Sequence, residues 1–151
     1  MNSRLLDHLT QEHAAIGEFI ELLDAEAQAM TDGDFANMPG LAERKSQLAD
    51  QIALLDRLRE VEQLALGYAA NRSGADAAAV GNNALQKVWS SLLERATQAH
   101  ERNHRNGVMI HTHLDFTRQA ISFLQASGQP LYGPDGTHKT STGSGNRLAL
   151  G

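Results

Sequence analysis

The sequence contains no cysteine, which excludes disulfide bonds, thiolate chemistry and zinc sites with cysteine ligands. This absence fits a reducing compartment. Aromatic residues make up only 5% of the chain and there are three prolines, whereas hydrophobic residues of all kinds make up 41%. Such a composition favours helices built from alanine and leucine over a β-sandwich, which needs aromatic and β-branched residues. We therefore expect an all-α protein.

A long apolar run and a basic stripe are also missing. No apolar stretch approaches the roughly 18 to 20 residues needed to span a bilayer, and residues 1–4 lead into a polar amphipathic pattern without the apolar core of a signal peptide. We expect a cytoplasmic protein that does not insert into membranes. The formal net charge is −5, and lysine and arginine form no stripe that could hold a phosphate backbone. Nucleic acid is therefore not an expected partner.

Apolar residues recur at helical spacing in three segments of the chain. The first, about residues 3–31, has a heptad seam that steps by threes and fours. This seam consists of Leu6, Leu9, His13, Ile16, Ile20, Leu23, Ala27 and Met30. The next residues break the helix, and Gly33 suits the left-handed conformation that follows many helix ends.

The second segment, about residues 38–66, has a seam that changes phase half-way along. It starts as Leu41, Lys45, Leu48, Ile52 and Leu55 and continues as Leu58, Val61 and Ala65. A phase shift changes the local winding of a coiled coil, so the second half of this helix is expected to face a different neighbour. We interpret residues 67–83 as a connector with room for one short helical turn.

The third segment, residues 83–126, predicts a helix roughly 60 Å long at 1.5 Å per residue, too long to be covered by one compact domain. Its first part has a narrow seam that would pack on the other two helices. The seam consists of Leu85, Val88, Trp89, Leu92, Ala96 and Ala99, continued by Asn103, Asn106 and Ile110. We expect an elongated antiparallel three-helix bundle or coiled coil over residues 1–126, with a long C-terminal helix, followed by a flexible tail over residues 127–151.

Beyond Gly107 the apolar arc of the third segment roughly doubles in width. The residues of this widened face are Met109, Leu114, Phe116, Ala120, Ile121, Phe123 and Leu124. Two interpretations are open. Either a loop or the first helix caps this end of the bundle, or the face is exposed and binds a helix of another protein.

Six of the seven histidines lie on the first and third predicted helices, which invites comparison with di-iron helical bundles. They are His8, His13, His100, His104, His111 and His113. A di-iron carboxylate bundle needs an acid from each of two helices and a Glu-x-x-His motif from two others. Only Glu101-x-x-His104 is present, and His100, His104 and His111 would point to solvent. We therefore expect no metal site and no cofactor.

The remaining polar residues on the seams have structural interpretations. His13 and His113 are expected to be partly buried and hydrogen-bonded to a neighbouring helix. Asn103 and Asn106 are interpreted as polar residues that fix the register of a coiled-coil seam. No nucleophile, base and orienting acid occur together and no glycine-rich phosphate loop is present, so we do not expect an enzyme.

Residues 127–151 contain too few apolar side chains to offset the entropy of ordering them. Their isolated apolar residues predict a short linear contact that folds on binding. This contact consists of Leu131, Tyr132, Gly133, Leu148 and Leu150. The alternative is that Tyr132 folds back onto the end of the third helix.

Three motifs together resemble the FlgN family of flagellar type III export chaperones. They are Asn103-x-x-Asn106-Gly107 inside a long helix, Leu131-Tyr132-Gly133-Pro134-Asp135-Gly136 later in the chain, and Glu43-Arg44-Lys45-Ser46-Gln47-Leu48 near the start of the second helix. Their order and spacing agree with the family over essentially the whole chain. Only the connector at residues 67–83 has no counterpart.

The resemblance implies a cytoplasmic export chaperone for the hook-associated proteins of the hook-filament junction. In that family, the C-terminal part of the chaperone captures the aggregation-prone terminal helices of its clients and delivers them to the export apparatus. The implied partners are the C-terminal helical segments of hook-filament junction proteins and components of the flagellar export gate and ATPase complex. Tyr132 is our hypothesis for a contact with the gate.

Two other classes of protein remain open. A coiled-coil adaptor would use the same helices without chaperone activity, with the acidic first helix as its docking face. A metal-dependent helical bundle is the third class. The oligomeric state is also open, because a heptad seam of this length serves either an intramolecular bundle or a homo-oligomer.

We predict that deletion of residues 127–151 leaves helicity and thermal stability nearly unchanged, because a flexible tail contributes little to a folded core. Circular dichroism and thermal unfolding of the shortened chain measure both quantities. A large loss of stability would mean that the tail is packed.

Overall fold

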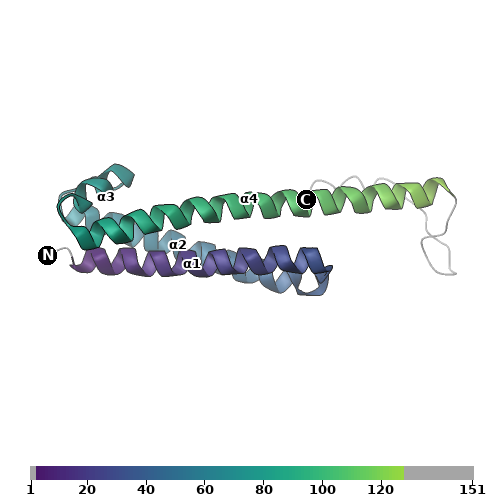
Figure 1. Ribbon diagram of the computed structural model, residues 1–151, viewed down its shortest axis with the longest axis horizontal. Coiled ribbons are helices and arrows are strands. Elements are labelled where there is room, and N and C mark those ends of the chain that lie inside the picture. The colour runs from purple at the N-terminus through teal and green to yellow at the C-terminus, as the bar shows by residue number, and fades with distance from the viewer. Residues whose placement is uncertain (1–2, 128–151) are drawn as a thin grey trace. The chain divides into compact units, whose positions relative to one another are not determined.

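The computed structural model describes residues 3–127, and within that range every regular element is a helix. Figure 1 labels α1 (Ser3–Asp32), α2 (Met38–Ala65), α3 (Arg72–Ala79) and α4 (Asn83–Ala126), and a short 3-10 turn (Phe35–Asn37) precedes α2. The all-α prediction is confirmed. The three long helices begin and end within one residue of their predicted boundaries.

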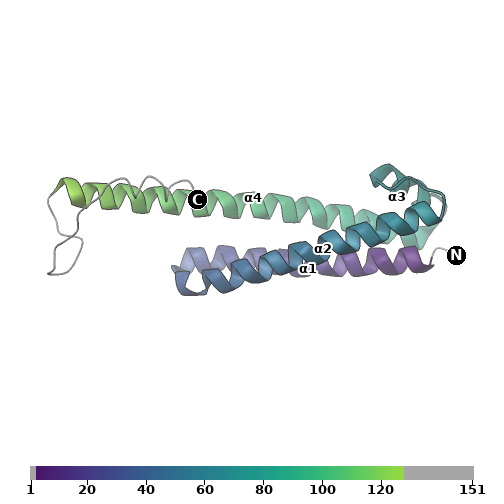
Figure 2. The same cartoon turned by 180° about the vertical axis from the view of Figure 1, so that it is seen from behind.

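The chain divides into two compact units, Met1–Ile110 and His111–Gly151. The first unit contains α1, α2, α3 and the first part of α4; Figures 1 and 2 show α1, α2 and this part of α4 side by side, with the short α3 at the end where α4 begins. The second unit contains the last part of α4, from His111 to Ala126.

Side-chain bonds between helices fix the directions of the helices in the first unit. Glu12 of α1 pairs with Arg59 of α2 (Oε2 to Nε, 3.0 Å), and Glu26 pairs with Lys45 (Oε1 to Nζ, 3.2 Å). Because later residues of α1 meet earlier residues of α2, the two helices are antiparallel. Hydrogen bonds also join an earlier residue of α1 to residue 91 of α4 and a later residue of α1 to residue 106. Because later residues of α1 meet later residues of α4, these two helices are parallel.

Gly33 makes the turn between α1 and α2 possible. Its φ angle is 73°, a conformation that glycine adopts without the steric cost of a side chain. Its amide donates to the carbonyl of Met30 (3.3 Å), and the amide of Asp34 donates to the carbonyl of Ala29 (2.8 Å). These two bonds satisfy carbonyls that the end of α1 would otherwise leave unpaired, as in the Schellman motif. The predicted role of Gly33 is confirmed.

The core of the first unit is a single apolar cluster drawn from α1, α3 and α4. Its buried members are Leu5, Leu9, Ile16, Leu23, Ala75, Ala78, Ala79, Leu85, Trp89, Leu92 and Ala99. Leu48 and Leu55 contribute the buried apolar residues of α2. The predicted seam of the third segment is therefore largely correct over residues 85–99.

The seam of α1 differs from the prediction because two glutamates belong to it. Glu12 and Glu26 are each only 3% exposed, whereas Leu6, His13 and Ile20 are half-buried. The buried positions therefore follow a heptad through Leu5, Leu9, Glu12, Ile16, Leu23 and Glu26. An apolar pattern cannot detect such glutamates, because their burial depends on partners from other helices.

The predicted phase shift in α2 is wrong. Leu58 and Val61 are 41% and 58% exposed, and Ala65 is also exposed. The original seam continues instead through Arg59 and Gln63, which are 5% and 0% exposed. A single seam along α2 is thus preserved by two buried polar side chains, and the apolar residues that suggested a shift lie on the outer face.

The connector contains more structure than one helical turn. It forms α3, eight residues long, whose first turn is capped because Asn71 Oδ1 accepts a hydrogen bond from the Gly74 amide (2.9 Å). Gly74 is buried so close to the Ala69 carbonyl that a Cβ atom would lie 1.8 Å from its oxygen. Ala75, Ala78 and Ala79 turn their methyl groups into the core.

Asn106 is the buried polar residue of α4. It is 0% exposed, and its Nδ2 donates to the Leu23 carbonyl (2.7 Å) and to Glu26 Oε1 (2.9 Å). Its predicted place in the seam is confirmed. Asn103, which we predicted to share this role, is exposed; the buried positions at this end of α4 recur every seven residues, at Leu92, Ala99 and Asn106, and Asn103 lies to one side of that line.

We predict that Asn106→Leu lowers the free energy of unfolding by about 1–3 kcal/mol, since it removes the two buried hydrogen bonds that Asn106 donates and leaves the buried Glu26 with fewer donors. Asn103→Leu is the matched control, and it should change stability by no more than about 0.5 kcal/mol because it lies on the surface. Urea unfolding followed by circular dichroism measures both. Equal effects of the two substitutions would contradict the assignment.

Candidate binding surface on the C-terminal helix

The part of α4 in the second unit carries large apolar side chains exposed to solvent. Phe116 and Phe123 are each 70% exposed, Leu114 is 51%, Ile121 is 41% and Leu124 is 37%. Ala120 is exposed as well. Because burying one side chain of this size contributes about 1.5–3 kcal/mol, this group is a strong candidate for contact with another protein.

Helical spacing gathers these residues on one side of α4. Phe116 and Phe123 are seven residues apart and nearly eclipsed along the axis, as are Leu114 and Ile121. Ala120 and Leu124 lie between the two lines, so the apolar arc covers about half of the helix circumference at 100° per residue. We call Leu114, Phe116, Ala120, Ile121, Phe123 and Leu124 the apolar face of the second unit.

The opposite side of the same helix segment is polar and its side chains contact one another. Asp115 contacts Arg118 (Oδ1 to Nη1, 3.2 Å) and His111 (Oδ2 to Nε2, 3.6 Å). These pairs link residues three and four apart and support the helix without covering its apolar face. A segment with one charged side and one wide apolar side has the form of a helix that packs on other helices.

Both interpretations of the widened face stay predictions. Its side chains beyond residue 110 are exposed in the described part of the chain. Met109 differs from the other predicted members, because it is half-buried and belongs to the first unit. Gly107, from the same predicted motif as Asn106, is exposed and has open space where a Cβ would lie.

The histidines divide into two groups. His13 is half-buried and its Nε2 lies 2.7 Å from Ser91 Oγ, so its predicted bond to a neighbouring helix is confirmed. Burial, with a smaller contribution from Arg95, lowers the pKa of His13 below its usual 6.5. His113 is exposed, so the prediction that it is partly buried is wrong; it lies in the second unit, beyond the buried seam.

The predicted solvent exposure of His100, His104 and His111 is confirmed. Across residues 3–127, no three histidine, aspartate or glutamate side chains come together in a way that could hold a metal ion. The same part of the chain has no helix that is both long enough and apolar enough to cross a membrane.

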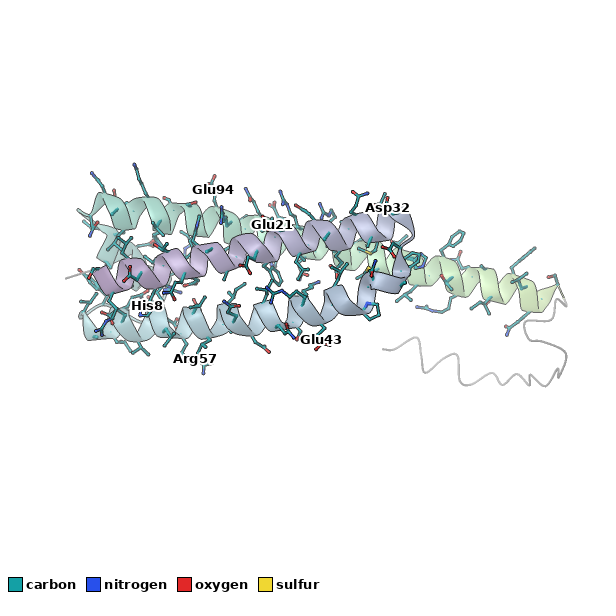
Figure 3. All side chains as sticks on the ribbon, turned by 90° about the horizontal axis from the view of Figure 1, so that it is seen from below. His8, Glu21, Asp32, Glu43, Arg57 and Glu94 are labelled. Atoms are coloured by element: carbon teal, nitrogen blue, oxygen red, sulfur yellow. The ribbon has the colours of Figure 1, made fainter. Side chains whose placement is uncertain are left out.

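A second group of exposed apolar residues lies on α2 and was not recognised as a surface from the sequence. Leu54, Leu58, Val61 and Leu64 are between 41% and 59% exposed. Their neighbour Arg57 projects outward from the same helix (Figure 3). The sequence did contain a signal for this surface, namely the apparent phase shift of the seam. Such a shift is expected when a helix has one row of apolar residues on its inner face and a second row on its outer face.

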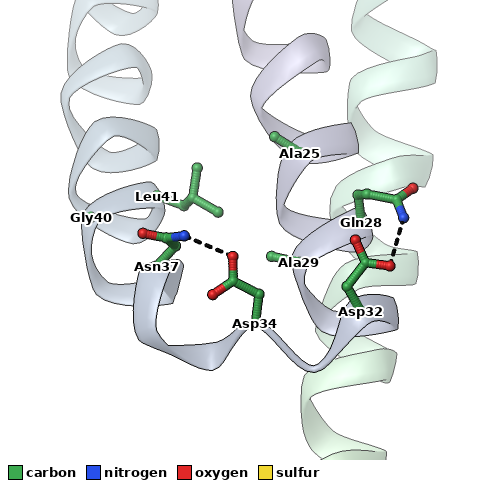
Figure 4. Close-up of a pocket in the computed structure, with 8 residues that line it drawn as sticks. All are labelled: Ala25, Gln28, Ala29, Asp32, Asp34, Asn37, Gly40 and Leu41. Atoms are coloured by element: carbon green, nitrogen blue, oxygen red, sulfur yellow. Dashed lines mark hydrogen bonds between the residues drawn. The ribbon is translucent and has the colours of Figure 1, made fainter.

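Two open cavities lie in the first unit. One, of about 470 Å³, is at the turn between α1 and α2, where Asp34 accepts from Asn37 (2.7 Å) and Asp32 accepts from Gln28 (3.0 Å), as Figure 4 shows. Both aspartates are therefore engaged by side chains of the turn itself. These hydrogen bonds stabilise the end of α1 and the turn that follows it.

The other cavity, of about 420 Å³, reaches a buried ion pair. Glu12, Arg59 and Trp89 are among its lining residues. Burial raises the pKa of Glu12 from 4.5 to about 7, although the positive charge of Arg59 opposes this shift. Glu12 thus changes charge near neutral pH within the core of the first unit.

The predicted tail contacts lie outside the described residues. They are Leu131, Tyr132, Gly133, Leu148 and Leu150. Of the two predicted contact sites, the apolar face of the second unit is therefore the one that lies within the described residues.

The chain is similar to proteins that are named for flagella synthesis. The model of the FlgN protein family matches residues 1–140. Flagella synthesis protein FlgN of Yersinia enterocolitica is 28% identical over 145 residues, which cover 89% of this chain and 94% of that protein. The FlgN protein of a serotype O:8 strain of the same species is 27% identical over 150 residues, with 97% of each chain covered.

A more distant relative is Flagella synthesis protein FlgN of Proteus mirabilis, 22% identical over 153 residues that cover 99% of this chain and all of that protein. No solved structure matches the chain significantly. The matched range includes every helix described above and residues 131–136, but not Leu148 or Leu150. The chain belongs to the FlgN family.

Proposed function

We propose that this protein is a cytoplasmic chaperone of flagellar assembly that binds the C-terminal helical segments of hook-filament junction proteins. Its relatives support a role in flagellar synthesis. The observation that carries the finer proposal is the apolar face of the second unit, which leaves two phenylalanines 70% exposed. Client helices that assemble only after export have an apolar side exposed before export, and this face offers them a substitute partner.

The contact is expected to be apolar rather than electrostatic. The charged side chains described on this segment, among them Asp115 and Arg118, pair with each other on the opposite side. A helix laid along Leu114, Phe116, Ile121 and Phe123 would bury side chains spaced over three helical turns. Such binding is non-covalent, so the proposal requires no cofactor.

The adaptor alternative is weakened at its proposed docking face on α1. Among the acidic residues of that helix, Glu12 and Glu26 are buried. Glu18 pairs with Arg44 (3.4 Å) and Asp24 pairs with Arg102 (2.8 Å). Four acidic residues of α1 are therefore buried or paired with side chains of other helices, which makes α1 a less favourable docking face than the apolar face of the second unit.

We predict that the double substitution Phe116→Ser and Phe123→Ser weakens client binding about 100-fold or more, which corresponds to about 3 kcal/mol of lost apolar burial. Both side chains are exposed, so helicity should be retained. The measurement is a calorimetric titration with the isolated C-terminal helical segment of a hook-filament junction protein from the same cell.

The matched control for this titration is Leu58→Ser with Val61→Ser, which removes apolar side chains of comparable exposure from α2. This control should bind the client as the unaltered chain does. Equal loss in both variants would contradict the placement of the surface. Absence of binding by the unaltered chain would favour an adaptor without chaperone activity.

The second proposed contact is between Tyr132 and the flagellar export gate, with delivery of the client as its result. Tyr132 lies in the part of the chain that the family model matches. We predict that Tyr132→Ala reduces binding to purified export-gate components, whereas Leu148→Ala with Leu150→Ala, outside the matched range, has a smaller effect. Pull-down of gate components and client titration measure the two activities. The hypothesis is wrong if Tyr132→Ala changes neither.

A further inference from the structure

α3 is held on the first unit by small apolar contacts. Its buried residues are Gly74, Ala75, Ala78 and Ala79, none with a side chain larger than a methyl group. A helix of eight residues is not stable by itself in water, so α3 depends on docking. Because alanine buries little apolar area, the polar bonds around α3 have a large share in holding it.

Two side chains of the long helices make those polar bonds. Gln63 of α2 donates from Nε2 to the carbonyls of Ala69 (2.7 Å) and Asn71 (3.0 Å), at the entry to α3. Trp89 of α4 donates from Nε1 to Asp76 Oδ1 of α3 (2.6 Å). The docked position of α3 therefore depends on the positions of Gln63 and Trp89.

Arg59 contacts both Gln63 and Trp89. Its Nη1 donates to Gln63 Oε1, and its guanidinium carbon lies 5.2 Å from the centre of the Trp89 ring, within the range of a cation–π contact. The same guanidinium binds two carboxylates, Glu12 through Nε (3.0 Å) and Asp56 through Nη2. One buried cation thus faces two acids when both are ionised, and the group is neutral when Glu12 is protonated.

The cavity over this group has α3 as part of its wall. Arg72, the first residue of α3, lines it together with Glu12, Arg59 and Trp89. Undocking of α3 would remove Arg72 from this wall. The other charged side chains at the cavity are Asp56 of α2 and Arg72 itself, whereas the lining residues of α4 are uncharged.

We propose that α3 is a latch on the end of the first unit, and that the charge of Glu12 controls how often the latch undocks. When α3 is docked, Glu12 is buried and its protonated form is favoured; when α3 is undocked, Glu12 is hydrated and ionises readily. Docking is therefore strongest at low pH and weakens as the pH rises through the pKa of the buried group, about 7. This device is a property of the free chain and does not depend on the proposed client.

Native-state hydrogen exchange tests the latch. The amides of Gly74, Ala75 and Val80 are protected by bonds within the α3 region, to Asn71 and Ala77. With a docked pKa of about 7 and a hydrated value of 4.5, linkage predicts that their opening equilibrium rises about tenfold between pH 6 and pH 8. Exchange rates are corrected for the intrinsic effect of pH, and amides of α4 near Leu92 serve as an internal reference that should not show this rise.

Four variants separate Glu12 from other causes. Glu12→Gln keeps the shape of the protonated acid and should abolish the pH dependence. His8→Gln and His13→Gln should each retain it, and they test the two histidines of α1 that lie nearest to Glu12 in the sequence. Asp76→Ala, at an exposed position, removes the acceptor of Trp89 and should increase opening at both pH values.

The single tryptophan of the chain provides a second readout, since Trp89 loses its partner when α3 undocks. Its emission should shift in Asp76→Ala, and in the unaltered chain it should change with pH in parallel with exchange. The proposal is overturned if exchange in the α3 region is independent of pH in the unaltered chain, or if Glu12→Gln retains the tenfold change. Unaltered exchange in Asp76→Ala would also contradict it.

Discussion

The unequal length of the helices is the constraint on which the other features depend. α4 has 44 residues, whereas α1 has 30 and α2 has 28. At 1.5 Å per residue, α1 and α2 are long enough to cover only about two-thirds of α4. The apolar face that continues to Leu124 lies in the second unit, and its exposed side chains support the proposal that it binds another protein.

Within the first unit, buried polar side chains decide which faces of the helices meet. Glu12, Glu26, Arg59, Gln63 and Asn106 are all at most 5% exposed, and each bonds to a residue of another helix or of the connector. A buried polar group without a partner is costly, so a shift in register that separated these groups would be strongly unfavourable. The same bonds keep Leu58 and Val61 on the outer face of α2, because the inner positions are taken by Arg59 and Gln63.

The two units therefore suit different tasks. The first has a defined core, fixed in register by paired polar groups, and a short helix docked at one end. The second has an apolar face exposed on a helix whose opposite side carries local polar contacts around Asp115, among them an ion pair with Arg118. This combination is consistent with the proposed capture of a client helix by the second unit.

The sequence alone predicted the all-α class, the boundaries of the three long helices and the members of the apolar face around Phe116 and Phe123, because helical periodicity is a local property of the chain. It also placed Asn106 on the seam. It did not predict that Asn103 is exposed, that α2 keeps one seam through Arg59 and Gln63, or that the connector forms α3. These features depend on which side chains from distant parts of the chain meet. The burial of Glu12 or Gln63 is favourable only beside the partner that the fold supplies, and only the tertiary structure decides that pairing.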